Sequence, residues 1–303
     1  MGSLLRLDQF NLTPQAGAHF ERDLDFVRQQ VLEDRRPPKN AFLLIPQAGD
    51  VPDWAETYTH RMVEFIGRAK FIADYADDLP RVDIAGREAT FNVKSFGVAY
   101  EFSRKEILRS AQGLGLSDKR PRAAREAIEE KFNRIQWYGD PSAGLFGLLN
   151  FPYIPRYAMT VAFDGSAEPH DVLAELNALS RQPAILTDDT ASPNTLLLAP
   201  EKYYYVSDTP LREGSDTTIL EHFLGTHPGW TVESVNELRG AGPTGGDVAV
   251  VYRRDPLNVE HKLVEPFTQL PAQARNLAVV TNCVAQSGGV VSDYPQEMVI
   301  GEH

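Results

Sequence analysis

The clearest helical pattern near the N-terminus covers residues 19–33. Four apolar residues recur there at helical spacing, namely Phe20, Leu24, Val27 and Val31. The pattern predicts a short amphipathic helix that ends before residues 35–38, where two arginines and two prolines follow one another. A helix of this length cannot bury its apolar stripe alone, so we expect it to pack on another surface.

A second and longer helical pattern covers residues 118–138. Asp118 can cap the helix, Pro121 lies in its first turn, and residues 139–141 (Gly-Asp-Pro) end it. One face is apolar and consists of Ala124, Ile128, Phe132 and Ile135. Basic residues crowd the first turns, namely Lys119, Arg120, Arg122 and Arg125. The helix dipole favours negative charge at this end, so the cluster is either a solvated face or a surface that receives acidic groups or phosphates.

Residues 54–103 show almost no helical period and contain two runs with strand character. The first run lies around Tyr58–Ile72, and in the second, Ala89–Phe102, alternate residues share a face. Residues 77–87 between the runs are rich in turn formers. We therefore predict a long β-hairpin. Because an isolated hairpin is marginally stable in water, we expect it to rest on another surface.

Short helices and strands alternate from Tyr157 to about Asp255. Helices are predicted at residues 169–180, 200–207 and 216–224, and strands at residues 195–199, 231–235 and 248–252. This alternation is typical of a small α/β unit. Strand character returns from Asn258 to Ile300, with Val279–Val284 and Val290–Val291 separated by Ser287-Gly288-Gly289. We expect these last strands to complete a sheet beside the long helix.

Composition narrows the class of protein. The chain has 303 residues, of which 42% are hydrophobic and 24% charged, which suits a folded protein with a real core. Its uninterrupted apolar runs are only a few residues long, so no membrane-spanning helix and no signal peptide are predicted. The single cysteine, Cys283, excludes an internal disulfide framework and is expected to be a small buried side chain. The net charge of −12 argues against wrapping nucleic acid with the whole surface.

Motifs that would indicate catalysis or cofactor binding are nearly absent. Residues 240–245 (GAGPTG) have the letters of a dinucleotide motif, but a strand follows them in place of the required helix, so we interpret them as a loop. His222 and His227 are five residues apart and do not share a helix face as a metal pair does. The acidic residues Asp74, Asp77, Asp78 and Asp83 lack the order of a calcium loop. We therefore predict no catalytic residue, no cofactor and no metal site, and we expect a protein that contacts other proteins.

Six segments spread along the chain are more informative together than any one of them alone. They are residues 73–83 (ADYADDLPRVD), 93–100 (VKSFGVAY), 123–131 (AAREAIEEK), 144–150 (GLFGLLN), 194–203 (NTLLLAPEKY) and 287–291 (SGGVV). Together they resemble one subfamily of the HK97-type major capsid proteins of tailed bacteriophages and prophages. The resemblance spans nearly the whole chain and is weakest in the first fifteen residues.

The resemblance implies an α+β fold of the HK97 type. Its parts are an N-terminal arm (residues 1–53), a long β-hairpin called the E-loop (54–103), a P-domain with a long spine helix (104–156), an inserted α/β A-domain (157–255) and closing strands of the P-domain (256–303). The hairpin of one subunit is expected to lie across a neighbouring subunit, and the A-domain to point at the centre of a ring of subunits.

The same resemblance implies a structural function. The chain is expected to be a major capsid protein, and no enzyme, that assembles into hexamers and pentamers of an icosahedral shell around double-stranded DNA, which it contacts weakly. The expected partners are other copies of the chain, a portal, and a separate scaffolding or decoration protein, with no membrane. The expected location is the virion, after assembly in the host cytoplasm. Two alternatives stay open: an encapsulin-type nanocompartment shell, and an unrecognised enzyme that uses the α/β unit 157–255.

One hypothesis concerns the contacts of assembly. The basic start of the long helix (Lys119, Arg120, Arg122 and Arg125) is predicted to receive the acidic residues Asp74, Asp77 and Asp78 from the hairpin of a neighbour. Such pairing would offset the unfavourable position of the basic residues in the field of the helix dipole.

Overall fold

The computed structural model describes residues 37–67, 71, 81–111, 119–212, 214 and 216–302. Residues Lys39–His303 form one unit of the chain. The helix predicted at residues 19–33, the cap at Asp118 and the acidic residues Asp74, Asp77 and Asp78 lie outside the described residues.

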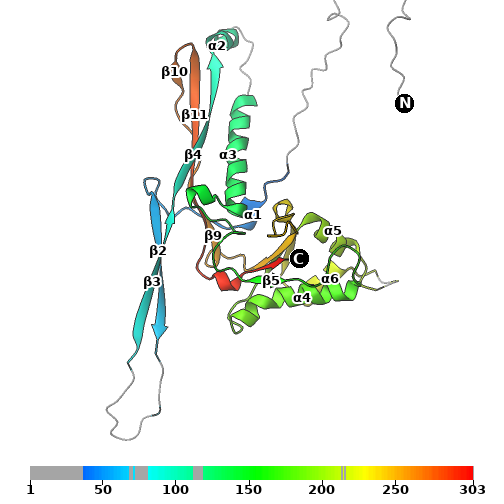
Figure 1. Cartoon of the computed structure of the whole chain (residues 1–303). Coiled ribbons are helices and arrows are strands. Elements are labelled where there is room, and N and C mark those ends of the chain that lie inside the picture. The colour runs from blue at the N-terminus through cyan, green and yellow to red at the C-terminus, as the bar shows by residue number, and fades with distance from the viewer. Residues whose placement is uncertain are drawn as a thin grey trace, which may run out of the picture. The chain divides into compact units, whose positions relative to one another are not determined.

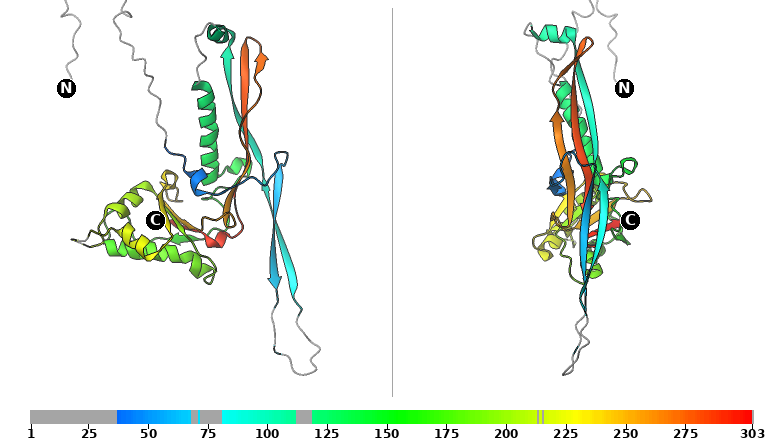
Figure 2. Two further views of the ribbon diagram at one scale, coloured as in Figure 1. Left: turned by 180° about the vertical axis from the view of Figure 1, so that it is seen from behind. Right: turned by 90° about the vertical axis from the view of Figure 1, so that its left-hand side faces the viewer.

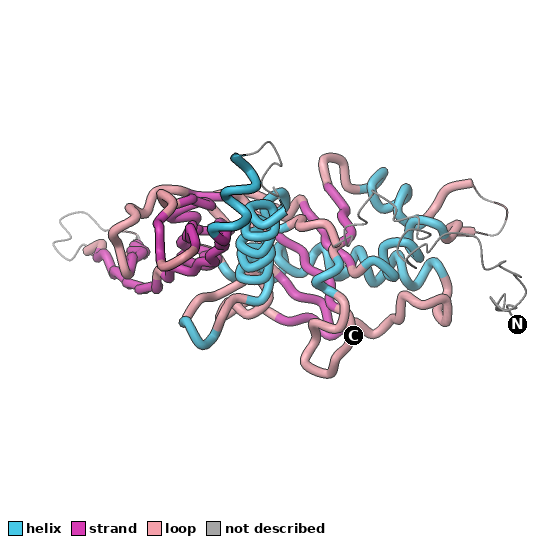
Figure 3. The backbone as a smooth tube through the Cα atoms, turned by 90° about the horizontal axis from the view of Figure 1, so that it is seen from above, coloured by secondary structure: helices cyan, strands magenta, loops and turns pink. Residues whose placement is uncertain are grey.

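A five-stranded sheet and one long helix form the first part of this unit (Figure 1). The strands follow the order β1-β9-β11-β10, and β4 also pairs with β11. Their bounds are β1 Gln47–Ala48, β4 Lys94–Ser103, β9 Val259–Gln269, β10 Gln273–Arg275 and β11 Ala278–Ser292. The long helix α3, Lys119–Tyr138, lies against this sheet, and Figure 3 shows it nearly end-on beside the strands.

The apolar face predicted for the long helix is confirmed. Ala124, Ile128, Phe132 and Ile135 are all buried. The first three pack with Cys283 and Ala285 of β11. Helix α3 is therefore fixed on the sheet by one apolar stripe, as its sequence pattern predicts. The short helix α2, Arg104–Ala111, precedes it.

A second five-stranded sheet forms the α/β part, in the order β5-β12-β8-β6-β7. The strands are β5 Arg156–Ala158, β6 Thr195–Leu198, β7 Thr231–Ser234, β8 Val248–Tyr252 and β12 Val299–Glu302. The helices of this part are α4 Pro169–Leu186, α5 Pro200–Asp208 and α6 Ile219–Thr226, and the short 3₁₀ helices of the described chain are Pro141–Ala143, Asn236–Leu238 and Pro295–Glu297. Side chains of α4 and α6 pack with one face of the sheet through Leu176, Phe223 and Val251.

The other face of the second sheet packs against the end of α3 and the short helix α1, Ala41–Leu44. Trp137 and Tyr252 are fully buried there, and the Tyr252 hydroxyl donates a hydrogen bond of 2.7 Å to the carbonyl oxygen of Leu44. Strand β1 pairs with β9 in the first sheet. The arm predicted to extend to residue 53 is therefore wrong for residues 41–48, because they belong to the core of the body.

Three strand predictions need correction. The run Ala89–Phe102 is two strands: β3, Asp83–Asn92, pairs with β2, Thr57–Ile66, whereas β4 pairs with β11, so the hairpin ends at Asn92 and not at residue 103. Strand β11 continues through Gly288-Gly289 with irregular register against β9, so the glycines do not separate two strands. Strand β12 joins the second sheet, not the sheet beside α3.

One helix is longer than predicted. Helix α4 continues from Ser180 to Leu186 although Pro183 lies inside it. Proline removes one backbone donor and usually ends or kinks a helix. Here the side-chain hydroxyl of Thr187 donates to the carbonyl oxygen of Pro183 at 2.7 Å, which gives a backbone acceptor in the last turn of the helix a hydrogen-bond partner. The helices predicted at residues 200–207 and 216–224 correspond to α5 and α6, the latter beginning one residue after its cap, Thr218.

Candidate assembly site

The hairpin β2–β3 is the described element that pairs only with itself (Figures 1 and 2). Aromatic rings anchor its base. The ring of Tyr58 stacks on that of Phe91, with 5.4 Å between the ring centroids. The ring centroid of Phe91 lies 6.3 Å from those of both Phe146 and Phe151. The Tyr58 hydroxyl donates to the carbonyl oxygen of Gly288 at 3.3 Å. This packing fixes the start of the hairpin on the body.

A buried lysine lies beneath the same aromatic cluster. The side chain of Lys262 is only 2% exposed, and its Nζ donates to both carboxylate oxygens of Asp50 at 2.9 and 2.8 Å and also contacts Glu260. Burial alone would lower the pKa of Lys262, but the bonds to the two carboxylates raise it overall. Burial and the nearby carboxylates of Glu260, Asp50 and Asp293 also raise the pKa of Tyr58. The lysine therefore stays charged under the hairpin.

The hairpin base has a second polar contact on the body. His60 Nδ1 lies 2.9 Å from Asp293 Oδ1, next to the 3₁₀ helix Pro295–Glu297. With the aromatic cluster and the bond to Gly288, it attaches residues 58–60 and 91 to two segments of the body, 146–151 and 288–293. The angle at which the hairpin leaves the body is thus set by several independent contacts.

Beyond this base, one hairpin face is open to solvent. Nearest the base, Thr59 and Thr90 share a hydrogen bond of 3.1 Å, and Arg61 pairs with Glu88 at 2.8 Å. Further out, three apolar side chains are exposed: Val63 (57%) and Ile84 (62%) on this face, and Val82 (72%) just before β3 begins. We call these three residues the distal apolar face. An apolar surface in water is typical of a contact region.

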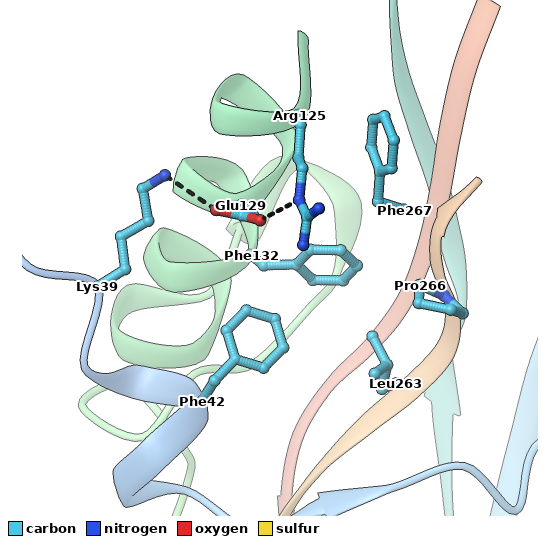
Figure 4. Close-up of a pocket in the computed structure, with 8 residues that line it drawn as sticks. All are labelled: Lys39, Phe42, Arg125, Glu129, Phe132, Leu263, Pro266 and Phe267. Carbon is cyan, nitrogen blue, oxygen red and sulfur yellow. Dashed lines mark hydrogen bonds and ion pairs between the residues drawn. The ribbon is translucent and has the colours of Figure 1, made fainter. Parts of the chain in front are cut away.

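A groove runs between α3 and β9, with α1 at one end (Figure 4). It has a volume of about 430 Å³ and is lined by Lys39, Phe42, Arg125, Glu129, Phe132, Leu263, Pro266 and Phe267. Arg125 donates to Glu129 at 2.8 Å, and Lys39 lies 3.4 Å from the other oxygen of the same carboxylate. Burial alone would raise the pKa of Glu129, but these two basic partners lower it overall. We call this feature the α3–β9 groove.

The basic start of α3 is partly neutralised within the chain. Arg120 makes two hydrogen bonds to the carboxylate of Glu106 in α2, at 3.0 and 2.9 Å, and its guanidinium lies 5.1 Å from the centre of the Phe102 ring. The bonds from Arg120 lower the pKa of Glu106 to about 2. Arg125 is held by Glu129, and Lys119 also has an interaction partner. Arg122 is exposed and has no hydrogen bond or ion pair with any described residue.

The structure therefore separates the predicted assembly residues into three groups. Lys119, Arg120 and Arg125 each have an interaction partner, Arg122 faces solvent, and Asp74, Asp77 and Asp78 lie outside the described residues. The α3–β9 groove was not predicted from the sequence, since its lining comes from three segments far apart in the chain. The apolar residues of the hairpin were visible in the sequence, but their exposure was not.

The remaining sequence candidates are structural. Residues 240–245 form a loop that leads into β8, as interpreted from the sequence, with positive φ at Gly240 and Gly245. Cys283 is buried in β11, and burial raises the pKa of its thiol, which confirms the prediction of a small buried side chain. Across the described residues, no three His, Cys, Asp or Glu side chains come together in a way that could hold a metal ion. No helix within the described ranges is both long and apolar enough to cross a membrane.

A family model described as Major capsid protein matches residues 67–302, well over half of the chain. The chain belongs to the major capsid protein family. It is a structural protein that forms a capsid shell, and the family match favours this function over both the nanocompartment and the enzyme. The virion is accordingly its location, and other copies of the chain are its partners.

Solved structures agree on the fold of this capsid protein. A structure described as the capsid of Myoviridae Phage XM1 aligns with a TM-score of 0.82 at 13% identity, covering 95% of this chain and 99% of the other. A chain from Mycobacterium phage Bobi aligns with a TM-score of 0.62 at 15% identity over 92% and 95% of the two chains. A virus-like particle from Pyrococcus furiosus aligns with a TM-score of 0.55 at 11% identity, over 86% and 91%. The predicted α+β fold of the HK97 type is thus confirmed, while a comparison with curated proteins found no match.

Proposed function

We propose that this capsid protein assembles through hexamers and pentamers into an icosahedral shell around double-stranded DNA, and that the hairpin of each copy lies across a neighbour. The observation that carries the proposal is the distal apolar face, whose three side chains are more than half exposed in the single chain. Covering this face with a second copy removes apolar area from water, so that assembly stabilises each subunit.

The proposal extends to other partners and to the site of assembly. A portal and a separate scaffolding or decoration protein would complete the head, and assembly would take place in the host cytoplasm. The net charge of −12 supports a shell that touches packaged DNA weakly, since an acidic surface does not release counterions from the phosphate backbone.

Expression of the full chain, followed by size-exclusion chromatography and negative-stain microscopy, tests the proposal. We expect closed particles with pentameric and hexameric units. A chain that stays a monomer or dimer at every concentration, alone and with the other head proteins of its phage, would contradict it.

Within this assembly we propose that Arg122 is the principal receiver of the hairpin carboxylates Asp74, Asp77 and Asp78 of a neighbour. Support comes from the contacts of Arg120 and Arg125, which already have carboxylate partners in their own chain. Arg122→Glu is expected to lower the particle yield severalfold while the monomer stays folded, because it places like charges opposite each other. Particle yield by sedimentation and folding by circular dichroism measure the two effects.

Two variants serve as controls for this experiment. Arg134→Glu makes the same charge change at an exposed position near the other end of α3 and should leave the yield unchanged. Asp77→Lys with Asp78→Lys should restore assembly of Arg122→Glu by exchanging the charges. An Arg122→Glu chain with full particle yield would remove Arg122 from the interface.

A further inference from the structure

A second groove lies at the base of the hairpin, beside the end of α4 (Figure 1). Its lining comes from β3, from the end of α4 and the loop that follows it, from Tyr153, and from the 3₁₀ helix Pro295–Glu297 with the two residues before it. We call it the α4–hairpin groove. Its volume of about 890 Å³ is in the range of pockets that hold drug-sized ligands, so a short stretch of peptide fits into it.

Two exposed tyrosines contribute to the walls of this groove. Tyr153 is 85% exposed and Tyr294 is 57% exposed, and the neighbouring side chain of Leu186 is 48% exposed. Aromatic residues are enriched where proteins contact each other. An open tyrosine ring attracts the cationic end of a lysine or arginine side chain and also packs against its alkyl stem. The walls therefore suit long cationic side chains.

All the charged side chains that line the α4–hairpin groove are acidic, namely Glu88, Asp188, Asp293 and Glu297. Glu88 and Asp293 lie within ion-pair distance of basic side chains of β2. The carboxylates of Asp188 and Glu297 have no hydrogen bond or ion pair with any described residue. Two negative charges in the groove are therefore without a partner in the described part of the chain.

These two carboxylates restrict what can cover the groove. A neutral or acidic occupant would remove Asp188 and Glu297 from water without giving them a partner, which is costly. A second copy of the chain has a net charge of −12 and suits an acidic surface less well than a basic protein does. The occupant that fits both the carboxylates and the tyrosines carries arginine or lysine side chains.

We propose that the α4–hairpin groove binds an extended segment of a separate protein, and that this segment carries arginine or lysine side chains. Asp188 and Glu297 accept charge-assisted hydrogen bonds from these side chains, and the rings of Tyr153 and Tyr294 pack against them. All the lining residues belong to one copy of the chain. The inference therefore goes beyond the proposed function, and the unassembled chain is sufficient to test it.

Fluorescence anisotropy of a labelled peptide of alternating arginine and glycine, added to the full unassembled chain at about 0.15 M salt, tests the proposal. Asp188→Asn with Glu297→Gln removes the two unpaired charges and keeps the sizes of the side chains. We expect the Kd of the peptide to rise about tenfold or more, because two charge-assisted contacts are lost.

The matched control is Asp53→Asn with Glu233→Gln, which makes the same change in net charge at two exposed positions outside the groove. It should change the Kd by less than about twofold, because exposed charges away from the peptide are screened by salt. A large effect of the groove pair and a small effect of the control supports the proposal. Equal weakening by both pairs, or no saturable binding of the peptide to the native chain, would overturn it.

A second pair of variants tests the aromatic wall. Tyr153→Asn should raise the Kd about two- to fivefold, as expected for the loss of a cation–π contact near the surface. Asparagine is chosen because the φ of residue 153 is +68°, which asparagine tolerates. Tyr204→Asn, at a 61% exposed position on α5 outside the groove, is the control and should leave the Kd unchanged. Equal effects of the two variants would contradict a role of the tyrosine wall.

Assembled particles distinguish a separate protein from a second copy as the occupant. They should bind the peptide as tightly as the unassembled chain does. If the particles lose this binding, a second copy covers the groove and the assignment to a separate protein is wrong. A failure of the chain to form particles would contradict the proposed function and would leave the result with the unassembled chain unaffected.

Discussion

Gly288 shows how one residue can determine whether the hairpin is anchored. A Cβ atom at this position would lie 2.9 Å from Cβ of Lys262 and 2.9 Å from Cε1 of Tyr58. Both neighbours are held in place, Lys262 by Asp50 and Glu260, and Tyr58 by its stacking on Phe91. The absence of a side chain at residue 288 is what lets the Tyr58 ring lie over the strand.

Replacing this glycine is expected to loosen the hairpin base. Gly288→Ala should lower the free energy of unfolding of the unassembled chain by about 1–3 kcal/mol, the usual cost of overpacking. Urea unfolding measures this change. Gly86→Ala is the matched control, because Gly86 lies in β3, where a Cβ atom would meet nothing within 4 Å. Equal stability of the two variants would show that the contact at residue 288 relaxes without cost.

At the scale of elements, helix α3 is the part that the sequence predicts best. Its apolar stripe comes from local spacing alone, and a helix that packs by one face keeps that spacing in the structure. Strands are different, since alternation identifies a strand but not its partner. Only Val93 separates β3 from β4, so the change of partner from β2 to β11 has no local signal.

The same limit explains the other differences between sequence and structure. Gly288-Gly289 is typical of a turn, yet Gly289, with φ +76°, forms part of an irregularity inside β11. Strand β12 joins the second sheet through a pairing with β8 some fifty residues earlier, which no local pattern reveals. The α3–β9 groove likewise depends on long-range packing, because its lining comes from three segments far apart in the chain, so no local sequence pattern gives its position.

The apolar face of α3 allows a test of how this helix packs on its neighbouring elements. Phe132→Ala should lower the free energy of unfolding by about 3–5 kcal/mol, because a buried ring that contacts Phe42 and Phe96 is replaced by a cavity. Arg134→Ala, an exposed change two residues away, should alter it by about 0.5 kcal/mol or less. Thermal or urea unfolding of the unassembled chain measures both. A small effect of Phe132→Ala would mean that the groove side of α3 collapses to fill the space.

For the whole molecule, the described surfaces divide into those that are satisfied within one chain and those that are not. The two sheets and their helices bury their apolar faces internally. The distal apolar face and the α3–β9 groove remain open. A chain with a stable body and uncovered apolar surfaces is expected to fold first as a monomer and then to gain stability from its neighbours.

The stability of that body should depend on pH through one buried histidine. His261 joins β9 to two other segments: Nδ1 lies 2.6 Å from Oε1 of Gln47, and Nε2 lies 2.8 Å from Oγ of Ser287. Burial lowers the pKa of His261 from 6.5 to about 3. The histidine therefore stays neutral in the folded chain under conditions in which the unfolded chain has already taken up a proton.

The direction of the pH effect is set by this difference between the folded and unfolded chain. The contribution of the neutral His261 to the free energy of unfolding is fully present above pH 6.5 and is lost progressively as the pH falls toward about 3. The reason is that only the unfolded state binds the extra proton between these two pH values. Between pH 6.5 and 4.5, above the ordinary range of the carboxylates, the free energy of unfolding should fall by up to about 1.4 kcal/mol per pH unit. His261→Gln should remove most of this slope in urea unfolding of the unassembled chain, whereas His170→Gln, at an exposed position in α4, should keep it. An unchanged slope in His261→Gln would mean that the pH dependence arises elsewhere in the molecule, and that the junction of β1, β9 and β11 does not control it.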